Sequence, residues 1–243
     1  MTCSPVLDDR WFRGVIYGVV VADLWGVEAG VGEAEPLEDD GWRSQFLEIV
    51  AAEAMGQGAP KYLEREVFVR MARRSQPGLL LLALPVLLMQ ANPYGHRSYL
   101  WKAWTAGLGL LAEDLVVMDQ AFQMVCRAMA GRPPGLWSGQ DRALTPIQGL
   151  LKTSQGEFSL AIRLARRQGG DPLLVSWLGA VTLIQGGWAA LPSTLRHGCL
   201  ESGILRQRWG DLDEAGLNQL ALNLYDRWRG RRPGPFPQAG FSV

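Results

Sequence analysis

The sequence predicts a single all-α domain, and three observations support this fold class. Apolar residues recur at helical spacing through most of the 243-residue chain. The regular alternation of apolar and polar residues that marks half-buried strands is lacking. A long apolar segment at 171–187 begins and ends with helix-boundary residues, which predicts a buried central helix. We divide the chain into a loose N-terminus (1–10), one compact multi-helix domain (11–229) and a Pro/Gly-rich C-terminal tail (230–243).

The composition narrows the class of protein. An apolar fraction of 48% is typical of a globular protein with a sizeable core, and a formal net charge of zero gives no overall attraction to nucleic acid. The longest apolar run, 78–89, is too short to span a bilayer. Three widely separated cysteines (Cys3, Cys126 and Cys199) show no metal-ligand spacing and indicate reduced thiols. We therefore expect a cytoplasmic protein with no membrane span and no nucleic-acid partner.

The first predicted helix covers residues 11–25. Its β-branched residues favour a strand by propensity, but the small residues Gly14, Gly18 and Ala22 repeat every four positions. That spacing places small side chains on one face of a helix, so we expect a closely packed helix. Residues 26–40 are rich in Gly, Glu and Asp and are predicted to form a loop.

Amphipathic patterning predicts the helices of the middle of the chain, at 41–55, 61–74, 79–89, 99–112 and 115–130. Residues 76–78, Gln-Pro-Gly, are predicted to form a turn before the third of these. Residues 131–146 hold three prolines and several glycines, which predicts a loop that could cover a cleft.

Three arginines share one side of the helix predicted at 158–167, namely Arg163, Arg166 and Arg167. Such a group is more often a solvated face than a phosphate site, and both interpretations stay open. A helical segment with Leu195, Cys199, Ile204 and Leu205 inward is predicted after Pro192. The last helix is predicted at 212–228, with Asp211 as its N-cap.

The central helix has a well-defined beginning. Gly169 and Gly170 predict a tight turn, and Asp171 can accept a free N–H of the first helical turn as N-cap. Pro172 then occupies the first helical position, where its missing N–H costs nothing. Nearly continuous apolar residues over 173–184 predict burial on most sides.

This stretch resembles the last signature of the ADP-ribosylglycohydrolase family, an all-α fold with a two-magnesium site. The family pattern is Gly-Gly-Asp-Thr-Asp-Thr, a small-residue helix with a late Gly, and an Ala/Leu-Pro step. The chain matches it at Gly169, Gly170, Asp171, Gly179, Ala180, Gly187, Leu191 and Pro192. Pro172, Leu173 and Leu174 stand where the family has metal-ligand positions, and apolar side chains cannot coordinate Mg²⁺. The resemblance therefore implies the fold more strongly than the activity.

A second family motif resembles residues 22–26. The family has Gly-Asp-Ala-Leu-Gly at the end of its first helix, and this chain has Ala-Asp-Leu-Trp-Gly, with the aspartate kept as Asp23. A family glutamate ligand would follow four residues after the last glycine, where this chain has Gly30. The resemblance covers roughly residues 14–228, with the motifs in the family's order.

The family's Thr-Asp-Asp-Thr metal motif can be aligned in two registers. One places it on 41–44, which contains no carboxylate, and puts Arg43 where a cation would bind. The other places it on 38–41, and brings Glu38, Asp39 and Asp40 to the site. The simpler explanation of the acidic triplet is that it favours the dipole of the following helix, with Asp40 as the cap.

No other catalytic constellation is found in the sequence. The only histidines are His96 and His197, and neither a Cys/His metal cluster nor a phosphate-binding glycine loop occurs. We assign no catalytic residue, no metal ligand and no cofactor, although the family would use two Mg²⁺ ions. The candidate residues of a vestigial site or possible cleft are Asp23, Glu38, Asp39, Asp40, Gly169, Gly170 and Asp171.

The resemblance, with most metal ligands replaced, implies a catalytically degenerate ADP-ribosylglycohydrolase-like protein. Its expected role is that of a protein-interaction, assembly or regulatory module with a protein partner. The tail at 230–243 is expected to be either disordered or a segment that docks this partner. Two alternatives stay open: a metal-dependent ADP-ribosyl hydrolase with rewired ligands, and a binder of ADP-ribose or a nucleotide that does not hydrolyse it.

Overall fold

A computed structural model describes residues 9–28, 41–55, 76–91, 110–132, 144–201, 203–210 and 212–231. Every regular element in these ranges is a helix, which confirms the all-α class. In chain order the helices are α1 (Arg10–Glu28), α2 (Trp42–Met55), α4 (Gln76–Gln90), α6 (Ala112–Met129), α7 (Thr145–Ser154), α8 (Phe158–Arg167), α9 (Pro172–Gly186), the short 3₁₀ helix η3 (Trp188–Ala190), α10 (Ser193–Leu200), α11 (Gly203–Trp209) and α12 (Glu214–Trp228).

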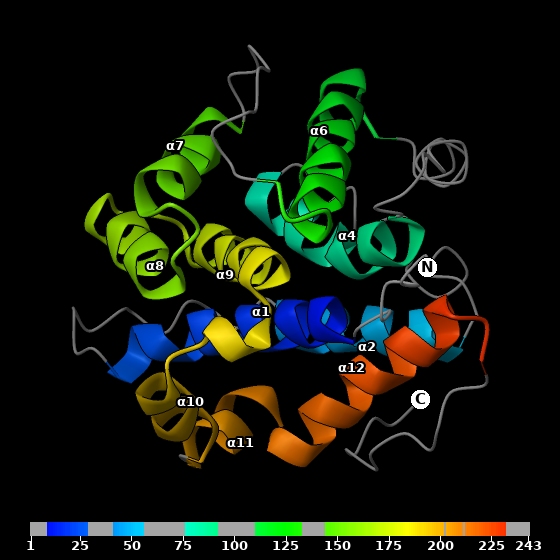
Figure 1. The fold of residues 1–243 in the computed structure, drawn as a ribbon, viewed down its shortest axis with the longest axis vertical. Helices are drawn as coiled ribbons and strands as arrows, with labels where there is room; N and C mark the ends of the chain where they lie inside the picture. Colours follow the sequence, from blue (N-terminus) through cyan, green and yellow to red (C-terminus); the bar gives the residue numbers. More distant parts are fainter. Residues whose placement is uncertain are drawn as a thin grey trace, which may run out of the picture.

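Helices α1 and α9 form the centre of the fold and pack against each other more extensively than any other described pair (Figure 1). Helices α4, α6, α7 and α8 gather on the α9 side, while α10, α11 and α12 lie on the other side of α1. Helix α2 contacts both α4 and α12. The α9 residues 175–184 are buried throughout, as expected for an apolar helix at the centre.

Glycines allow the close approach of α1 and α9. A Cβ added at Gly14 would lie 2.5 Å from the carbonyl oxygen of Leu183. A Cβ at Gly18 would lie 2.6 Å from the Cα of Ala180, and one at Gly179 would lie 2.5 Å from the carbonyl oxygen of Gly18. Increasing residue numbers along α1 therefore face decreasing residue numbers along α9, which shows that the two helices are antiparallel. The helix predicted at 11–25 from the small-residue spacing is therefore confirmed, and the strand favoured by the β-branched residues is not formed.

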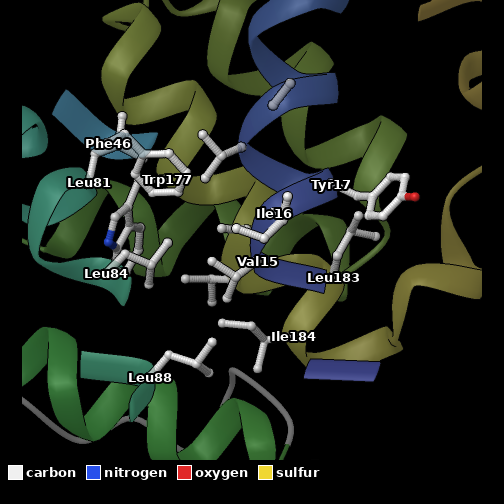
Figure 2. Close-up of a cluster of buried hydrophobic side chains, with 14 of the residues drawn as sticks. Val15, Ile16, Tyr17, Phe46, Leu81, Leu84, Leu88, Trp177, Leu183 and Ile184 are labelled. Carbon is white, nitrogen blue, oxygen red and sulfur yellow. The ribbon is translucent and has the colours of Figure 1, made fainter. Parts of the chain in front are cut away.

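The main core lies where α4 packs against the central pair (Figure 2). Trp177 of α9 is fully buried beside Leu81 and Leu84 of α4, and Val15 and Ile16 of α1 lie next to them (Figure 2). A buried aromatic surrounded by aliphatic side chains of two other helices removes a large apolar area from water. This cluster fixes the position of α1, which carries Asp23.

The turn predicted at 76–78 is wrong, because these residues form the first turn of α4. Proline is tolerated in a first turn, where its missing N–H would have no intrahelical partner. The helix predicted at 115–130 begins earlier, at Ala112. Of the helix predicted at 99–112, the described residues 110 and 111 are not helical, and Ala112 is the first residue of α6. Residues 99–109, like the helix predicted at 61–74, lie outside the described residues.

The sequence analysis missed α7. Residues 131–146 were predicted to form a loop, but α7 begins at Thr145, and 133–143 lie outside the described residues.

The N-cap of α12 is Asp213, whose carboxylate accepts the N–H of Gly216 at 2.8 Å, so the cap predicted at Asp211 is wrong. Residues 1–8 and 232–243, which hold most of both predicted terminal segments, are also outside the described residues. None of the described helices is long and apolar enough to cross a membrane.

Candidate functional site

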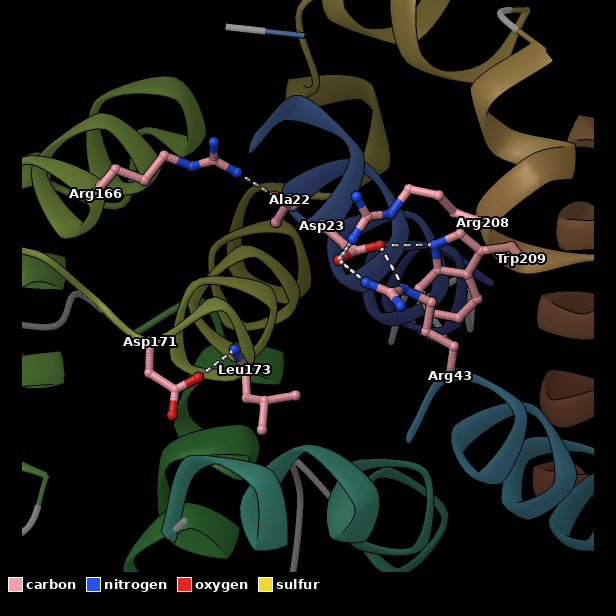
Figure 3. Close-up of polar contacts among 8 residues, drawn as sticks. All are labelled: Ala22, Asp23, Arg43, Arg166, Asp171, Leu173, Arg208 and Trp209. Carbon is pink, nitrogen blue, oxygen red and sulfur yellow. Dashed lines mark hydrogen bonds and ion pairs between the residues drawn. The ribbon is translucent and has the colours of Figure 1, made fainter. Parts of the chain in front are cut away.

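Asp23 on α1 accepts hydrogen bonds from two other helices (Figure 3). Arg43, in the first turn of α2, donates its Nε and Nη2 to the two carboxylate oxygens, each at 2.9 Å. Only 1% of the Asp23 side chain and 11% of the Arg43 side chain are exposed. A bidentate, charge-assisted pair of this kind is strong and directional. The carboxylate of Asp23 is therefore neutralised by a guanidinium.

Helix α11 supplies the remaining contacts to this carboxylate. Trp209 donates its indole N–H to Asp23 at 3.0 Å, and Arg208 approaches the same carboxylate at 3.5 Å. The Trp209 ring also packs edge-on against Trp42, with ring centroids 5.5 Å apart. We call Asp23, Arg43, Arg208 and Trp209 the Asp23 cluster. It joins α1, α2 and α11 through one buried acid.

Arg166 departs from the solvated face predicted for α8. Its Nη2 donates to the carbonyl oxygen of Ala22, one residue before Asp23, at 2.8 Å (Figure 3). Burial lowers the pKa of the Arg166 guanidinium, and the charge of Asp23 partly opposes this shift. Arg163 and Arg167 are exposed, as expected. Only one of the three arginines is directed toward α1.

Asp171 is the N-cap of α9, as predicted. Its carboxylate accepts the N–H of Leu173 at 2.8 Å, and Pro172 occupies the first helical turn. The turn before it is tight, because the N–H of Gly170 donates to Ala165 at 2.9 Å, which ends α8. Gly169 adopts φ +70°, a left-handed conformation that favours glycine. The Gly-Gly-Asp motif thus has a structural role at this helix junction.

The structure does not gather the other candidate residues into one constellation. Figure 3 shows the carboxylate of Asp171 directed at its own helix, whereas that of Asp23 is directed at α2 and α11. Glu38, Asp39 and Asp40 lie outside the described residues. Within the ranges given above, no three His, Cys, Asp or Glu side chains are grouped so as to hold a metal ion.

The contributions of α11 and α8 to this region were not predicted from the sequence. Trp209 and Arg208 lie almost the whole length of the domain away from Asp23 in sequence, and their local pattern is that of an ordinary amphipathic helix. Arg43 had a signal, because one register of the resembling motif placed it where the family would bind a cation. The orientation of Arg166 depends on how α8 packs beside α1, which its own sequence does not specify.

A second surface feature, which we call the Trp188 groove, lies near the other end of α1. It has a volume of about 460 Å³ and is lined by Arg13, Tyr17, Trp188, Arg196, Glu214, Ala215 and Asn218. The guanidinium carbons of Arg196 and Arg13 lie 4.4 Å and 5.9 Å from the centre of the Trp188 ring. Both distances fit cation–π contacts. Arg196 also forms an ion pair with Glu214.

Tyr17 contributes a phenol to the lining of the Trp188 groove. Its side chain is buried, and its hydroxyl donates to the carbonyl oxygen of Glu214 at 3.3 Å. Burial, helped by the negative charge of Glu214, raises the pKa of Tyr17 to about 12. The phenol is therefore neutral at physiological pH.

No family model, curated protein or solved structure matches this chain. The chemistry open to the Asp23 cluster therefore follows from its own residues alone. Both oxygens of Asp23 already accept hydrogen bonds, and a metal ion could bind to them only by displacing these donors. The cluster is built to connect helices and to concentrate positive charge.

Proposed function

We propose that the chain is a divergent, catalytically degenerate ADP-ribosylglycohydrolase-like protein that acts as an interaction, assembly or regulatory module. The observation that carries this proposal is the pair of Asp23 and Arg43, in which both oxygens of the retained acid are 2.9 Å from guanidinium nitrogens. A magnesium ion at this acid would have to displace the guanidinium and would face its positive charge. Magnesium also demands a nearly octahedral shell of oxygen ligands.

The second resembling motif supports the same proposal. Leu173 and Leu174 stand at positions where the family has metal ligands, and both are half-buried against the hydrophobic core. Their side chains hold the start of α9 in place, and they offer no oxygen to a hard cation. Asp171, beside them, is engaged as the cap of the same helix. The motif can therefore keep its helical geometry without its chemistry.

The absence of hydrolysis is tested with peptides that carry ADP-ribose on arginine or on serine. We expect no release of ADP-ribose above the uncatalysed rate, with or without Mg²⁺ or Mn²⁺. Asp23→Asn should make no difference, because the acid takes no part in chemistry. Metal-dependent release that disappears in Asp23→Asn would contradict the proposal and favour the hydrolase with rewired ligands.

The Trp188 groove has the composition of an interaction surface. Trp188 is half-buried between two arginines, and tryptophan and arginine are the residues that most often dominate binding energy at interfaces. Quantitative affinity purification of the full chain should identify a partner whose recovery falls at least five-fold in Trp188→Ala. Leu111→Ala, on an exposed residue at the start of α6, is the matched control and should keep that partner. Equal recovery with both variants would exclude this groove as the interface.

A further inference from the structure

Positive charge exceeds negative charge around Asp23. Arg43 holds both oxygens of this carboxylate at 2.9 Å, so the two residues neutralise each other. Arg208 reaches the same carboxylate only at 3.5 Å, which is long for a charge-assisted hydrogen bond. Arg166 donates to a neutral group, the carbonyl oxygen of Ala22. In the described part of the chain, two guanidinium charges therefore lack a carboxylate of their own.

One nitrogen of each of these two arginines, Nε, also lacks a hydrogen-bond acceptor. The Nε atoms of Arg166 and Arg208 are buried, and neither has an acceptor among the described residues. A buried donor without an acceptor is destabilising, because it has lost its hydrogen bond to water. Burial also lowers the pKa of Arg166, so the charged form is held there at a cost. A bound anion would supply acceptors and a compensating charge together.

Two different helices supply these guanidinium groups, which approach neighbouring residues of α1. Arg166 comes from α8 and Arg208 from α11, and their partners Ala22 and Asp23 are consecutive residues of α1 (Figure 3). The Arg208 side chain is 31% exposed and Arg166 is half-buried, so both can be reached from solvent. This combination of partial burial and access suits a small, strongly charged ligand.

We propose that Arg166 and Arg208 bind a phosphate-type oxyanion, carried either by a free phosphate compound or by a phosphorylated side chain of a partner. The planar donor forks of guanidinium groups match phosphate oxygens in pairs. Two uncompensated charges favour a dianion over a monovalent anion. Arg43 stays with Asp23 and takes no part. The site does not depend on the proposed function, since it would exist with or without hydrolase activity.

The test is isothermal titration of the full chain with pyrophosphate, and in a second arm with a phosphoserine peptide of otherwise neutral sequence, at constant ionic strength. We expect saturable binding with one site per chain. Arg166→Gln and Arg208→Gln should each raise the Kd at least ten-fold. Arg167→Gln, the next residue on α8 and fully outside the cluster, should change it less than two-fold. The probe that binds more tightly identifies the source of the phosphate group.

Absence of saturable binding for both probes would overturn the inference, as would an equal rise of the Kd in Arg167→Gln. Circular dichroism establishes that each variant is folded. Where a glutamine variant does not fold, the lysine variant keeps the charge and loses the planar fork. Arg166→Lys and Arg208→Lys should then raise the Kd at least three-fold, and unchanged binding in both would also refute the site.

Discussion

Arg43 and Asp23 form a bidentate ion pair in which the guanidinium nitrogens lie 2.9 Å from both carboxylate oxygens, with almost no exposure of the acid. The pair connects α1 to the start of α2. Trp209 of α11 donates a further hydrogen bond to the same acid, so three helices depend on one carboxylate. Both the stability of the fold and its lack of a free acid at this position follow from this arrangement.

Removing the guanidinium should destabilise the protein strongly. Arg43→Met leaves the Asp23 charge buried with too few donors, and breaking a buried pair from one side costs about 3–5 kcal/mol. The free energy of unfolding from urea denaturation measures this loss. Arg167→Met, on an exposed arginine, is the control and should change it by less than about 0.5 kcal/mol. The double variant Asp23→Asn/Arg43→Met should be more stable than Arg43→Met alone, and the reverse order would show that the pair is not desolvated.

The glycines of the central crossing should not tolerate a methyl group. Gly18→Ala would place its Cβ 2.6 Å from the backbone of α9 and should destabilise by about 1–3 kcal/mol. Gly149→Ala, in α7 with nothing within 4 Å of an added Cβ, should instead stabilise by about 0.5–1 kcal/mol, since alanine is the better helix former. Opposite signs in urea denaturation support the close α1–α9 contact. A stability gain at both sites would exclude it.

Asp171 should behave as a helix cap. Asp171→Ala loses the hydrogen bond to the N–H of Leu173 and should cost about 1 kcal/mol, while Asp171→Asn keeps an acceptor and should be nearly neutral. Asp213→Ala, at the N-cap of α12, provides a matched loss of similar size. A carboxylate kept only for metal binding would carry an uncompensated charge in the metal-free protein, and its removal would stabilise that protein. A stability gain in Asp171→Ala would therefore reverse our interpretation.

Tyr17 should make stability depend on pH in the alkaline range. Its pKa is raised from 10.0 in the unfolded chain to about 12 in the folded protein, so the unfolded state loses its proton first. The contribution of the protonated phenol to the free energy of unfolding is fully present below pH 10. This contribution, about 2–3 kcal/mol, is lost as the pH rises toward 12. Tyr17→Phe lacks this titration. The difference in unfolding free energy between wild type and variant, measured from pH 8 to pH 12, should shrink and then reverse, and a constant difference would contradict the assigned pKa.

The sequence specified the helices best where boundary residues and apolar patterning agreed. The cap at Asp171, the buried α9 and the helix at 158–167 were all predicted correctly, because their signals are local. The start of α4 was missed because Gln-Pro-Gly resembles a turn, although proline is also a common residue of a first helical turn. Helix α7 was missed because its amphipathic pattern follows a stretch of sequence rich in proline and glycine.

The candidate site was less predictable than the fold. Asp23 was selected by a resemblance that marked it as a former metal-site residue, but its partners Arg208 and Trp209 come from a helix at the far end of the sequence. Such contacts depend on how α11 packs against α1, which no local pattern encodes. Arg166 shows the same limit, because its neighbours Arg163 and Arg167 on α8 are solvated as expected.

The most direct test of the central claim is isothermal titration of the full chain with Mg²⁺ and Mn²⁺. Because Arg43 occupies both oxygens of Asp23, we predict no binding tighter than millimolar for either ion. Micromolar binding that is lost in Asp23→Asn, or in Asp39→Asn/Asp40→Asn, would contradict the degenerate site and restore the hydrolase.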